Sequence, residues 1–160
     1  MAISVGDKIP DVTLMTMTAD GPTPVQSSDV LGAGKVVLFA VPGAFTPTCS
    51  DHHLPGFVLR ADDLRAKGVD TIACVAVNDP FVMGAWGQTQ NTEGSVVMLS
   101  DGNGDFAAAM DLTMDGSKFG LGTRSQRYAA IIEDGVVTDL MVEPAPGLDV
   151  SSADSVLSKL

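Results

Sequence analysis

The sequence has few cysteines, few basic residues and no long apolar run, and each shortage excludes a class of protein. Two cysteines in 160 residues cannot build a disulfide framework, and a chain of this length buries a sizeable core without one. Only 9 residues are Lys or Arg, against 20 that are Asp or Glu. The net charge of -11 repels a phosphate backbone, so no nucleic-acid partner is expected.

Membrane and export features are scarce as well. No apolar stretch approaches the ~20 residues that a helix needs to cross a bilayer. The first residues, MAISVGD, have no basic start and no apolar h-region, so we expect no export signal. We therefore predict a cytoplasmic protein with no membrane partner. In that reducing setting, cysteine chemistry is more often catalytic than structural.

The remaining composition is typical of a folded chain. Hydrophobic residues make up 45% of the sequence and charged residues 18%, which is enough apolar surface to bury a core. No repeat, low-complexity tract or long linker interrupts the chain. Residues 1–160 are therefore predicted to form a single domain.

Short β-type runs alternate with helical segments along the chain. Two runs, residues 35–41 and 70–77, are apolar apart from their first one or two residues, which is typical of buried central strands. The dipeptide Asp134-Gly135 predicts a tight hairpin between the last two strands. The predicted strands are residues 12–18, 35–41, 70–77, 95–99, 127–133 and 136–143, with a turn-rich stretch at 19–24. The predicted helices are residues 47–67, 80–90, 105–110 and 151–160, the last capped by Ser151 or Ser152.

This order of elements predicts an α/β fold with a central mixed sheet. The two buried strands and the helix between them form a parallel β-α-β unit, which needs helices on both faces of the sheet. The late hairpin adds antiparallel strands. Pro55 lies inside the connecting helix and should kink it, because proline lacks a backbone donor. The expected result is a three-layer α/β/α sandwich of thioredoxin-like character.

Cys49 lies where the first buried strand leads into this helix. Pro47 suits the first helical position, so Thr46 is the natural N-cap and Cys49 falls in the first turn. Unpaired backbone N–H groups and the positive end of the helix dipole then surround the sulfur and favour the thiolate, which is the nucleophile. The carboxyl ends of such strands are also where α/β folds bind ligands. The pattern therefore predicts a reactive cysteine.

A thioredoxin has Cys-x-x-Cys at this strand-to-helix junction. In this sequence Thr46 stands where the first of those cysteines would be, so disulfide exchange within the motif is excluded. A hydroxyl at this position can instead hydrogen-bond to the sulfur or to an oxygen that approaches it.

The segment around Cys49 resembles the active site of the peroxiredoxins. Pro42-x-x-x-Thr46-x-x-Cys49 matches the family's signature, and VPGAFTPTCSDHHLPGF is similar to the type II, or peroxiredoxin-five-like, subfamily. Four further blocks resemble the subfamily in the same order: VGDKIPDV, KGVDTIACVAVNDPFVMGAWG, RSQRYAAIIEDGVV and VEPAPGLDVSSADSVL. The similarity extends along nearly the whole chain, and the chain is identified as a member of this family.

The resemblance implies a role for each matching residue. Cys49 would be the peroxidatic cysteine, which attacks one peroxide oxygen and becomes sulfenic acid. Thr46 would orient the peroxide by hydrogen bonding, and Pro42 would pack over the sulfur. Arg127 matches the catalytic arginine, whose charge favours the thiolate and stabilises the breaking O–O bond. Arg124 is the nearest competitor, but its position in the block matches less well.

Resolution of the sulfenic acid depends on which second thiol is available. Cys74 is a candidate resolving cysteine, but it lies in the middle of an apolar strand, and a core role is favoured for it. The C-terminal resolving cysteine of animal members is absent, since residues 147–150 read Gly-Leu-Asp-Val there. We therefore expect an external thiol, either glutathione with glutaredoxin or, as a second choice, thioredoxin.

The resemblance also implies substrates and an assembly. Hydrogen peroxide and small alkyl hydroperoxides are the expected substrates, and no metal, haem or flavin is needed because sulfur supplies both electrons. A homodimer built around the active-site loops is expected, with Phe45, Phe81 and Trp86 as candidate contact residues.

Three alternatives remain open from the residues alone. Cys49 could signal by oxidation with little turnover, as in a redox sensor or partner-binding module. A Cys–His pair with His52 or His53 could make a hydrolase, although no orienting motif accompanies it. The spacing of Cys49 and His52 could also begin a zinc site, but two further ligands are not evident in the sequence.

Overall fold

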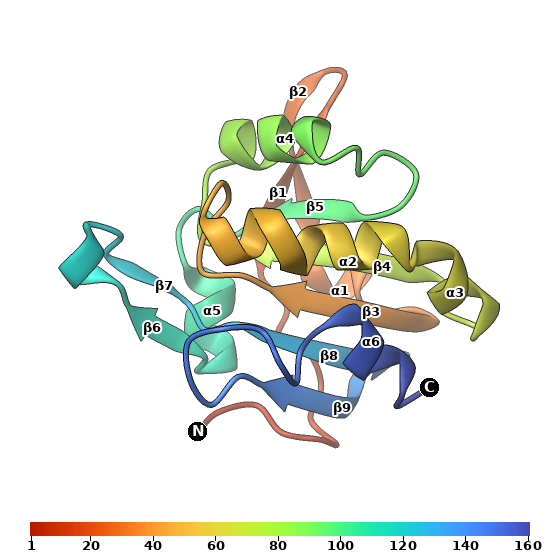
Figure 1. Ribbon diagram of the computed structural model, residues 1–160. Helices are drawn as coiled ribbons and strands as arrows, with labels where there is room; N and C mark the ends of the chain where they lie inside the picture. Colours follow the sequence, from red (N-terminus) through yellow and green to blue (C-terminus); the bar gives the residue numbers. More distant parts are fainter.

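The computed structural model describes residues 1–160 and places seven strands in one mixed sheet, in the order β2-β1-β5-β4-β3-β8-β9 (Figure 1). These strands are β1 Thr13–Thr18, β2 Gly21–Gln26, β3 Lys35–Ala40, β4 Thr71–Ala76, β5 Val97–Ser100, β8 Tyr128–Glu133 and β9 Val136–Val142. Two short strands form a separate hairpin, β6 Thr113–Asp115 and β7 Thr123–Ser125. The helices are α1 Ser27–Val30, α2 Leu54–Leu59, α3 Ala61–Ala66, α4 Pro80–Thr89, α5 Asp105–Met110 and α6 Ala153–Leu157.

The centre of the sheet is parallel and covered on both faces. β3 pairs with β4, and β4 pairs with β5, all in the parallel sense. Along β3 and just beyond it, Val37, Phe39 and Val41 enter one apolar cluster, whereas Val36 and Leu38 enter the other. This alternation explains the unbroken apolar run in the sequence, because a strand buried on both faces has no solvent side.

Helices complete a layer on each side of the sheet. Figure 1 shows α2, α3, α4 and α6 in front of the sheet, and their apolar residues join the cluster that contains Phe39. The other cluster includes Phe106 and Met110 of α5, together with Ile3 and Ile9 from the N-terminal segment. The predicted three-layer fold with a mixed sheet is confirmed. None of its helices has both the length and the apolar character to cross a membrane.

The late hairpin forms as predicted and brings a distant segment close to Cys49. Asp134 and Gly135 have φ values of 48° and 83°, the left-handed backbone that a two-residue hairpin turn requires. β8 runs antiparallel to β3, with Tyr128 opposite Ala40. The residue before Tyr128 therefore lies beside the end of β3, where the chain turns toward Cys49.

The stretch at residues 19–24 differs from the prediction of a turn. Only its first residues turn, and Gly21–Gln26 forms strand β2, which pairs antiparallel with β1. Pro22 and Pro24 are tolerated because β2 lies at the edge of the sheet, where a missing backbone donor costs no interior hydrogen bond. Proline content alone made this edge strand look like a turn.

The helix predicted over residues 47–67 is present but divided. Helical backbone begins at Pro47, passes through a π-helical turn at Cys49–His53 and continues as α2. It breaks at Arg60, with φ −96° and ψ 8°, before α3. A kink was expected at Pro55, and the structure has a π turn that ends two residues before this proline. π turns of this kind are frequent at functional sites.

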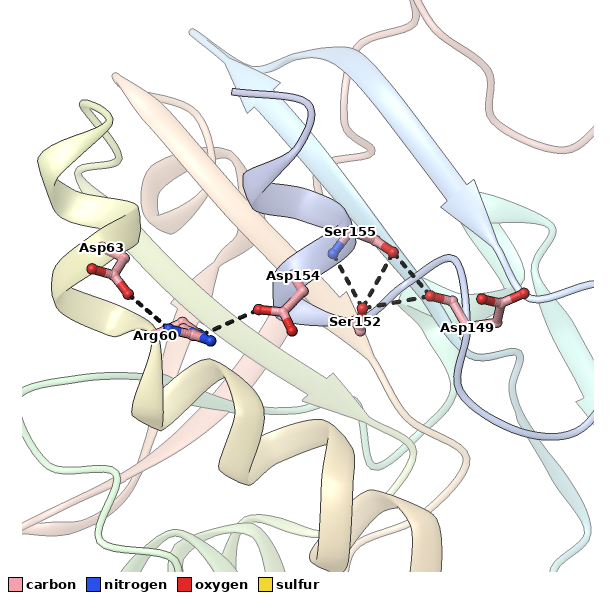
Figure 2. A network of polar contacts seen from close by, with 6 residues as sticks. All are labelled: Arg60, Asp63, Asp149, Ser152, Asp154 and Ser155. Carbon is pink, nitrogen blue, oxygen red and sulfur yellow. Dashed lines mark hydrogen bonds and ion pairs between the residues drawn. The ribbon is translucent and has the colours of Figure 1, made fainter.

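The C-terminal helix α6 is anchored to the break between α2 and α3 (Figure 2). Ser152 caps α6 by accepting a 3.1 Å hydrogen bond from the Ser155 N–H, which confirms the cap predicted at Ser151 or Ser152. Arg60 forms ion pairs with Asp154 of α6 at 3.2 Å and with Asp63 of α3 at 3.4 Å. Exposed pairs of this kind each contribute about 0–1 kcal/mol, so they orient α6 more than they stabilise it.

Candidate active site

Cys49 lies in the first turn of the helix that follows β3, and its side chain is fully buried. Its neighbours Thr46, Thr48 and Arg127 line a cleft of about 740 Å³. The outer wall of this cleft includes Met114, Phe119 and the loop at residues 143–147. The sulfur is therefore close behind the wall of a cleft that is far larger than hydrogen peroxide.

Arg127 contacts the sulfur directly. Its Nη2 donates a 2.9 Å hydrogen bond to Cys49 Sγ, across 78 positions of sequence. The backbone holds this arginine at both sides, since Tyr128 pairs with Ala40 and the Arg127 carbonyl accepts from the Glu143 N–H at 3.0 Å. A fixed guanidinium at this distance stabilises negative charge on the sulfur.

His53 lies on the other side of the same guanidinium. Its Nδ1 is 2.8 Å from Arg127 Nη1, and its Nε2 is 2.9 Å from the Ser151 carbonyl oxygen. A carbonyl can only accept, so Nε2 carries the proton and Nδ1 accepts from the arginine. Burial, reinforced by the charge of Arg127, lowers the pKa of His53 to about 3 despite the opposing backbone bond to Ser151. The imidazole is therefore neutral near pH 7.

This arrangement does not favour a hydrolase. The only unprotonated nitrogen of His53 is occupied by Arg127, and His52 is exposed. The sequence analysis missed the contact between His53 and Arg127. One signal was available, because Cys49 and His53 are four residues apart and so share a face of an α-helix.

The loop that holds His53 from outside is itself fixed by a carboxylate. Glu143 accepts hydrogen bonds from the Ser151 N–H at 2.8 Å, the Ser151 hydroxyl at 2.6 Å and the Asp149 N–H at 2.9 Å. Partial burial opposes the charge of Glu143, but these hydrogen bonds outweigh it and lower the pKa of the carboxyl. A continuous polar chain thus runs from Cys49 through Arg127, His53 and Ser151 to Glu143.

Thr46 occupies the N-cap position but does not cap with its side chain. Its carbonyl accepts from the Ser50 N–H at 2.9 Å, as expected just before the first helical residue. Its hydroxyl, however, donates to the Gly43 carbonyl at 2.7 Å, so the predicted side-chain cap is wrong. The tight loop brings that carbonyl within reach. The hydroxyl oxygen keeps lone pairs on the wall of the cleft, where they can accept a hydrogen bond.

The loop before Thr46 is held by distant side chains. Arg124 donates to the Pro42 carbonyl at 3.2 Å and to the Leu121 carbonyl at 2.9 Å. The Ala44 N–H donates to the Asn78 side chain at 2.9 Å. Arg124, the alternative to Arg127, therefore fixes the backbone of Pro42 and has no contact with the sulfur. Pro42 lines the cleft beside Thr46.

Cys74 occupies a different environment. It lies on β4 opposite Phe39 of β3, fully buried in the same apolar cluster as Cys49, and both thiols are free. Burial, with a smaller effect from Cys49, raises the pKa of the Cys74 thiol well above its ordinary value. This thiol stays protonated near pH 7, which fits a core residue; its role as a resolving cysteine stays untested.

The three aromatic residues expected at a dimer contact differ in their exposure to solvent. Phe45 and Phe81 are 54% and 66% exposed. Trp86 is fully buried, and its indole N–H donates to the Ser50 hydroxyl at 3.0 Å. The expectation that Trp86 is a contact residue is therefore wrong, because its ring fills the core between α4 and the active-site helix.

The structure does not support a zinc site at Cys49 and His52, since no three His, Cys, Asp or Glu side chains are grouped to hold a metal ion.

The fold and the site together define a thioredoxin-like protein with one cysteine held against an arginine at a helix start. Comparisons with known proteins identify its family. The family profile described as Redoxin matches residues 4–157. Peroxiredoxin-2E, chloroplastic, of Arabidopsis thaliana is 49% identical, with 99% of this chain and 70% of that protein covered. Peroxiredoxin-2B of the same plant is 46% identical, with 99% and 98% covered.

A solved structure agrees with these relatives. Reduced Prx3 of Vibrio vulnificus in complex with hydrogen peroxide has a TM-score of 0.94 and 50% identity to this chain, with 98% of each chain covered. The chain therefore belongs to the redoxin family, and among redoxins to the peroxiredoxins, which are thiol-dependent peroxidases. The expected resemblance and enzyme class are confirmed.

Proposed function

We propose that Cys49 is the peroxidatic cysteine and that it reduces hydrogen peroxide and small alkyl hydroperoxides. The observation that carries this proposal is the 2.9 Å hydrogen bond from Arg127 to the Cys49 sulfur. The other cysteine, Cys74, is fully buried in the apolar cluster, where burial raises the pKa of its thiol more than the charge of Arg127 lowers it. The hydrogen peroxide bound by the Vibrio vulnificus relative supports the smallest of these substrates.

The reaction follows from the groups around the sulfur. The Cys49 thiolate attacks one peroxide oxygen, an S–O bond forms and the O–O bond breaks. The departing hydroxide or alkoxide takes up a proton and leaves as water or alcohol, while the cysteine becomes sulfenic acid. Arg127 stabilises the charge that moves from sulfur to the leaving oxygen. Thr46 accepts a hydrogen bond from the peroxide, and Pro42 limits the access of water.

The sulfenic acid must then be reduced by a second thiol. An external thiol attacks its sulfur, releases water and leaves a mixed disulfide, which another thiol cleaves to regenerate Cys49. Glutathione with glutaredoxin is the proposed donor, and thioredoxin is the second candidate. The burial and raised pKa of the Cys74 thiol favour an external donor over an internal one, because the protonated thiol is a poor nucleophile.

Two properties of the protein outside the chemistry belong to the same proposal. A homodimer that covers Phe45 and Phe81 would remove two exposed aromatic rings from water, one in the loop of the active site and one in α4. A cytoplasmic location would provide the reducing thiols that the catalytic cycle requires.

Peroxide consumption coupled to glutathione, glutaredoxin and a glutathione reductase tests the function. The wild-type chain should turn over peroxide many times, and Cys49→Ser should reduce consumption to the background rate. Cys74→Ser is the matched control and should retain turnover. Stoichiometric oxidation of Cys49 without turnover by any thiol donor would assign a redox sensor instead, and activity that survives Cys49→Ser would exclude Cys49 as the site.

A further inference from the structure

The residue after the active cysteine is held by a helix that takes no part in the proposed chemistry. The Ser50 hydroxyl accepts from the Trp86 indole N–H at 3.0 Å, and the Ser50 carbonyl accepts from Gln90 Nε2 at 3.2 Å. Trp86 lies in α4, and Gln90 is the residue that immediately follows this helix. Because the two residues are four positions apart, they lie on the same face. Both side chains act as donors to the same residue.

The π turn explains why Ser50 needs such a donor. In this turn the N–H of Leu54 bonds to the carbonyl of Cys49, five residues earlier. The next donor in the same register is Pro55, which has no N–H to give to Ser50. A partly buried carbonyl without a donor is unfavourable, and the Gln90 carboxamide supplies the hydrogen bond that Pro55 cannot give.

We call the π turn closed when Ser50 is hydrogen-bonded to Trp86 and Gln90. The closed turn has opposite effects on the two halves of the proposed cycle. It keeps the Cys49 sulfur against Arg127, which suits attack on peroxide. It also keeps that sulfur fully buried, so a thiol as large as glutathione cannot reach the sulfenic acid until the turn opens. Any residue that stabilises the closed turn therefore accelerates the first half and slows the second.

We propose that Gln90 is a positioning residue that holds the Cys49 turn closed by donating to the Ser50 carbonyl in place of Pro55, with Trp86 as its partner on the Ser50 hydroxyl. The proposal rests on the proposed function, because it assigns a bias between peroxide reduction and thiol-dependent resolution. Gln90 touches neither substrate nor sulfur and acts only through Ser50.

The test measures the two half-reactions separately by rapid quench and intact mass. Gln90→Leu keeps the size of the side chain and removes the donor. It should slow the oxidation of Cys49 by peroxide about 3- to 10-fold, the range equivalent to one hydrogen bond, and should accelerate the reaction of the preformed sulfenic acid with glutathione. Gln88→Leu is the matched control, because Gln88 is an exposed glutamine on the same helix, and it should change neither rate.

Repeating the test in a Pro55→Ala variant shows whether the effect of Gln90 depends on the N–H that Pro55 lacks. Pro55→Ala restores a backbone N–H that can reach the Ser50 carbonyl, so Gln90→Leu should have less than about a 2-fold effect in that background. The fluorescence of Trp86, the only tryptophan of the chain, should shift in Gln90→Leu if the turn opens more often.

Several outcomes would overturn the inference. Equal slowing of both half-reactions would indicate only a general structural role. An effect of Gln90→Leu no larger than that of Gln88→Leu, or a full effect that persists beside Pro55→Ala, would exclude the missing-donor role. If the wild-type chain fails to consume peroxide with any donor, the proposed function fails instead, and the Trp86 fluorescence comparison between Gln90→Leu and Gln88→Leu still decides whether Gln90 holds the turn.

Discussion

The two cysteines lie in one apolar cluster and are equally buried, but their surroundings assign them to different tasks. Cys49 stands at the start of a helix with Arg127 at 2.9 Å from its sulfur. Cys74 stands in the middle of β4, and burial raises the pKa of its thiol more than the charge of Arg127 lowers it. What separates the two residues is a fixed positive charge and a helix start beside one of them.

Replacing the sulfur of each cysteine in turn should give the largest difference between the two residues. Cys49→Ser should abolish peroxide turnover, because a serine hydroxyl is not ionised near pH 7 and cannot replace the thiolate. Cys74→Ser should keep most of the turnover. Coupled peroxide assays give both rates. Comparable loss of activity in the two variants would mean that Cys74 takes part in the cycle.

Arg127 provides the next largest effect. Arg127→Gln leaves a polar side chain but removes the charge at the sulfur, and we expect the rate constant with peroxide to fall about 10²- to 10³-fold, as for loss of one electrostatic stabiliser of a transition state. Stopped-flow oxidation of Cys49 measures it. Arg124→Gln is the matched control, because Arg124 donates to backbone carbonyls only, and its effect should be at least tenfold smaller.

The neutral state of His53 predicts an acid sensitivity that the Cys74 region lacks. Its pKa is lowered from 6.5 to about 3 in the folded protein, so between these values the unfolded chain binds a proton that the native state does not. Stability should therefore fall as the pH drops below 6.5, by at most about 1.4 kcal/mol per pH unit. Urea denaturation at pH 7, 6 and 5 measures the slope.

The control for this slope is His53→Gln, whose amide can accept from Arg127 and donate to Ser151 but does not titrate. The slope between pH 6.5 and 5 should decrease in this variant. An unchanged slope would show that His53 is not the group responsible. Peroxide reactivity at pH 7 should drop only a few-fold, since the amide still holds the guanidinium.

The smallest effect on activity is expected from Cys74→Ala. Removing a buried sulfur leaves a small cavity, so the free energy of unfolding should fall by about 1–2 kcal/mol while the peroxide rate changes less than about twofold. Chemical denaturation and the coupled assay give the two numbers. Intact mass after one equivalent of peroxide sharpens the result, because loss of two hydrogens from the wild-type monomer would reveal a bond between Cys49 and Cys74 and contradict the core role.

Local patterns in the sequence were sufficient where neighbouring residues decide the structure. The hairpin at Asp134-Gly135 formed as predicted because its two turn residues adopt left-handed backbone. The buried strands around Val37 and Cys74 were recognisable from their continuous apolar runs. The position of Cys49 in the first helical turn followed from the buried strand before it and from Thr46 and Pro47.

Predictions failed where the local structure depends on contacts with residues far away in the sequence or in another loop. Strand β2 needed β1 and an edge position before its prolines could be accommodated. Trp86 was a candidate dimer contact, but its ring is buried and its N–H donates to Ser50 of another helix. The Thr46 hydroxyl was expected to cap the helix, and a loop carbonyl takes it instead.

Local sequence is sufficient to put Cys49 at a helix start, because a proline, a threonine and a buried strand lie within ten positions of it. The surroundings of that cysteine depend on residues that are far away along the chain. Arg127 reaches it across 78 positions because β8 lies beside β3, and His53 orients that arginine through a loop at Ser151. Backbone geometry depends on near neighbours, whereas the charge and hydrogen bonds at a buried sulfur depend on which distant strands and loops pack against it.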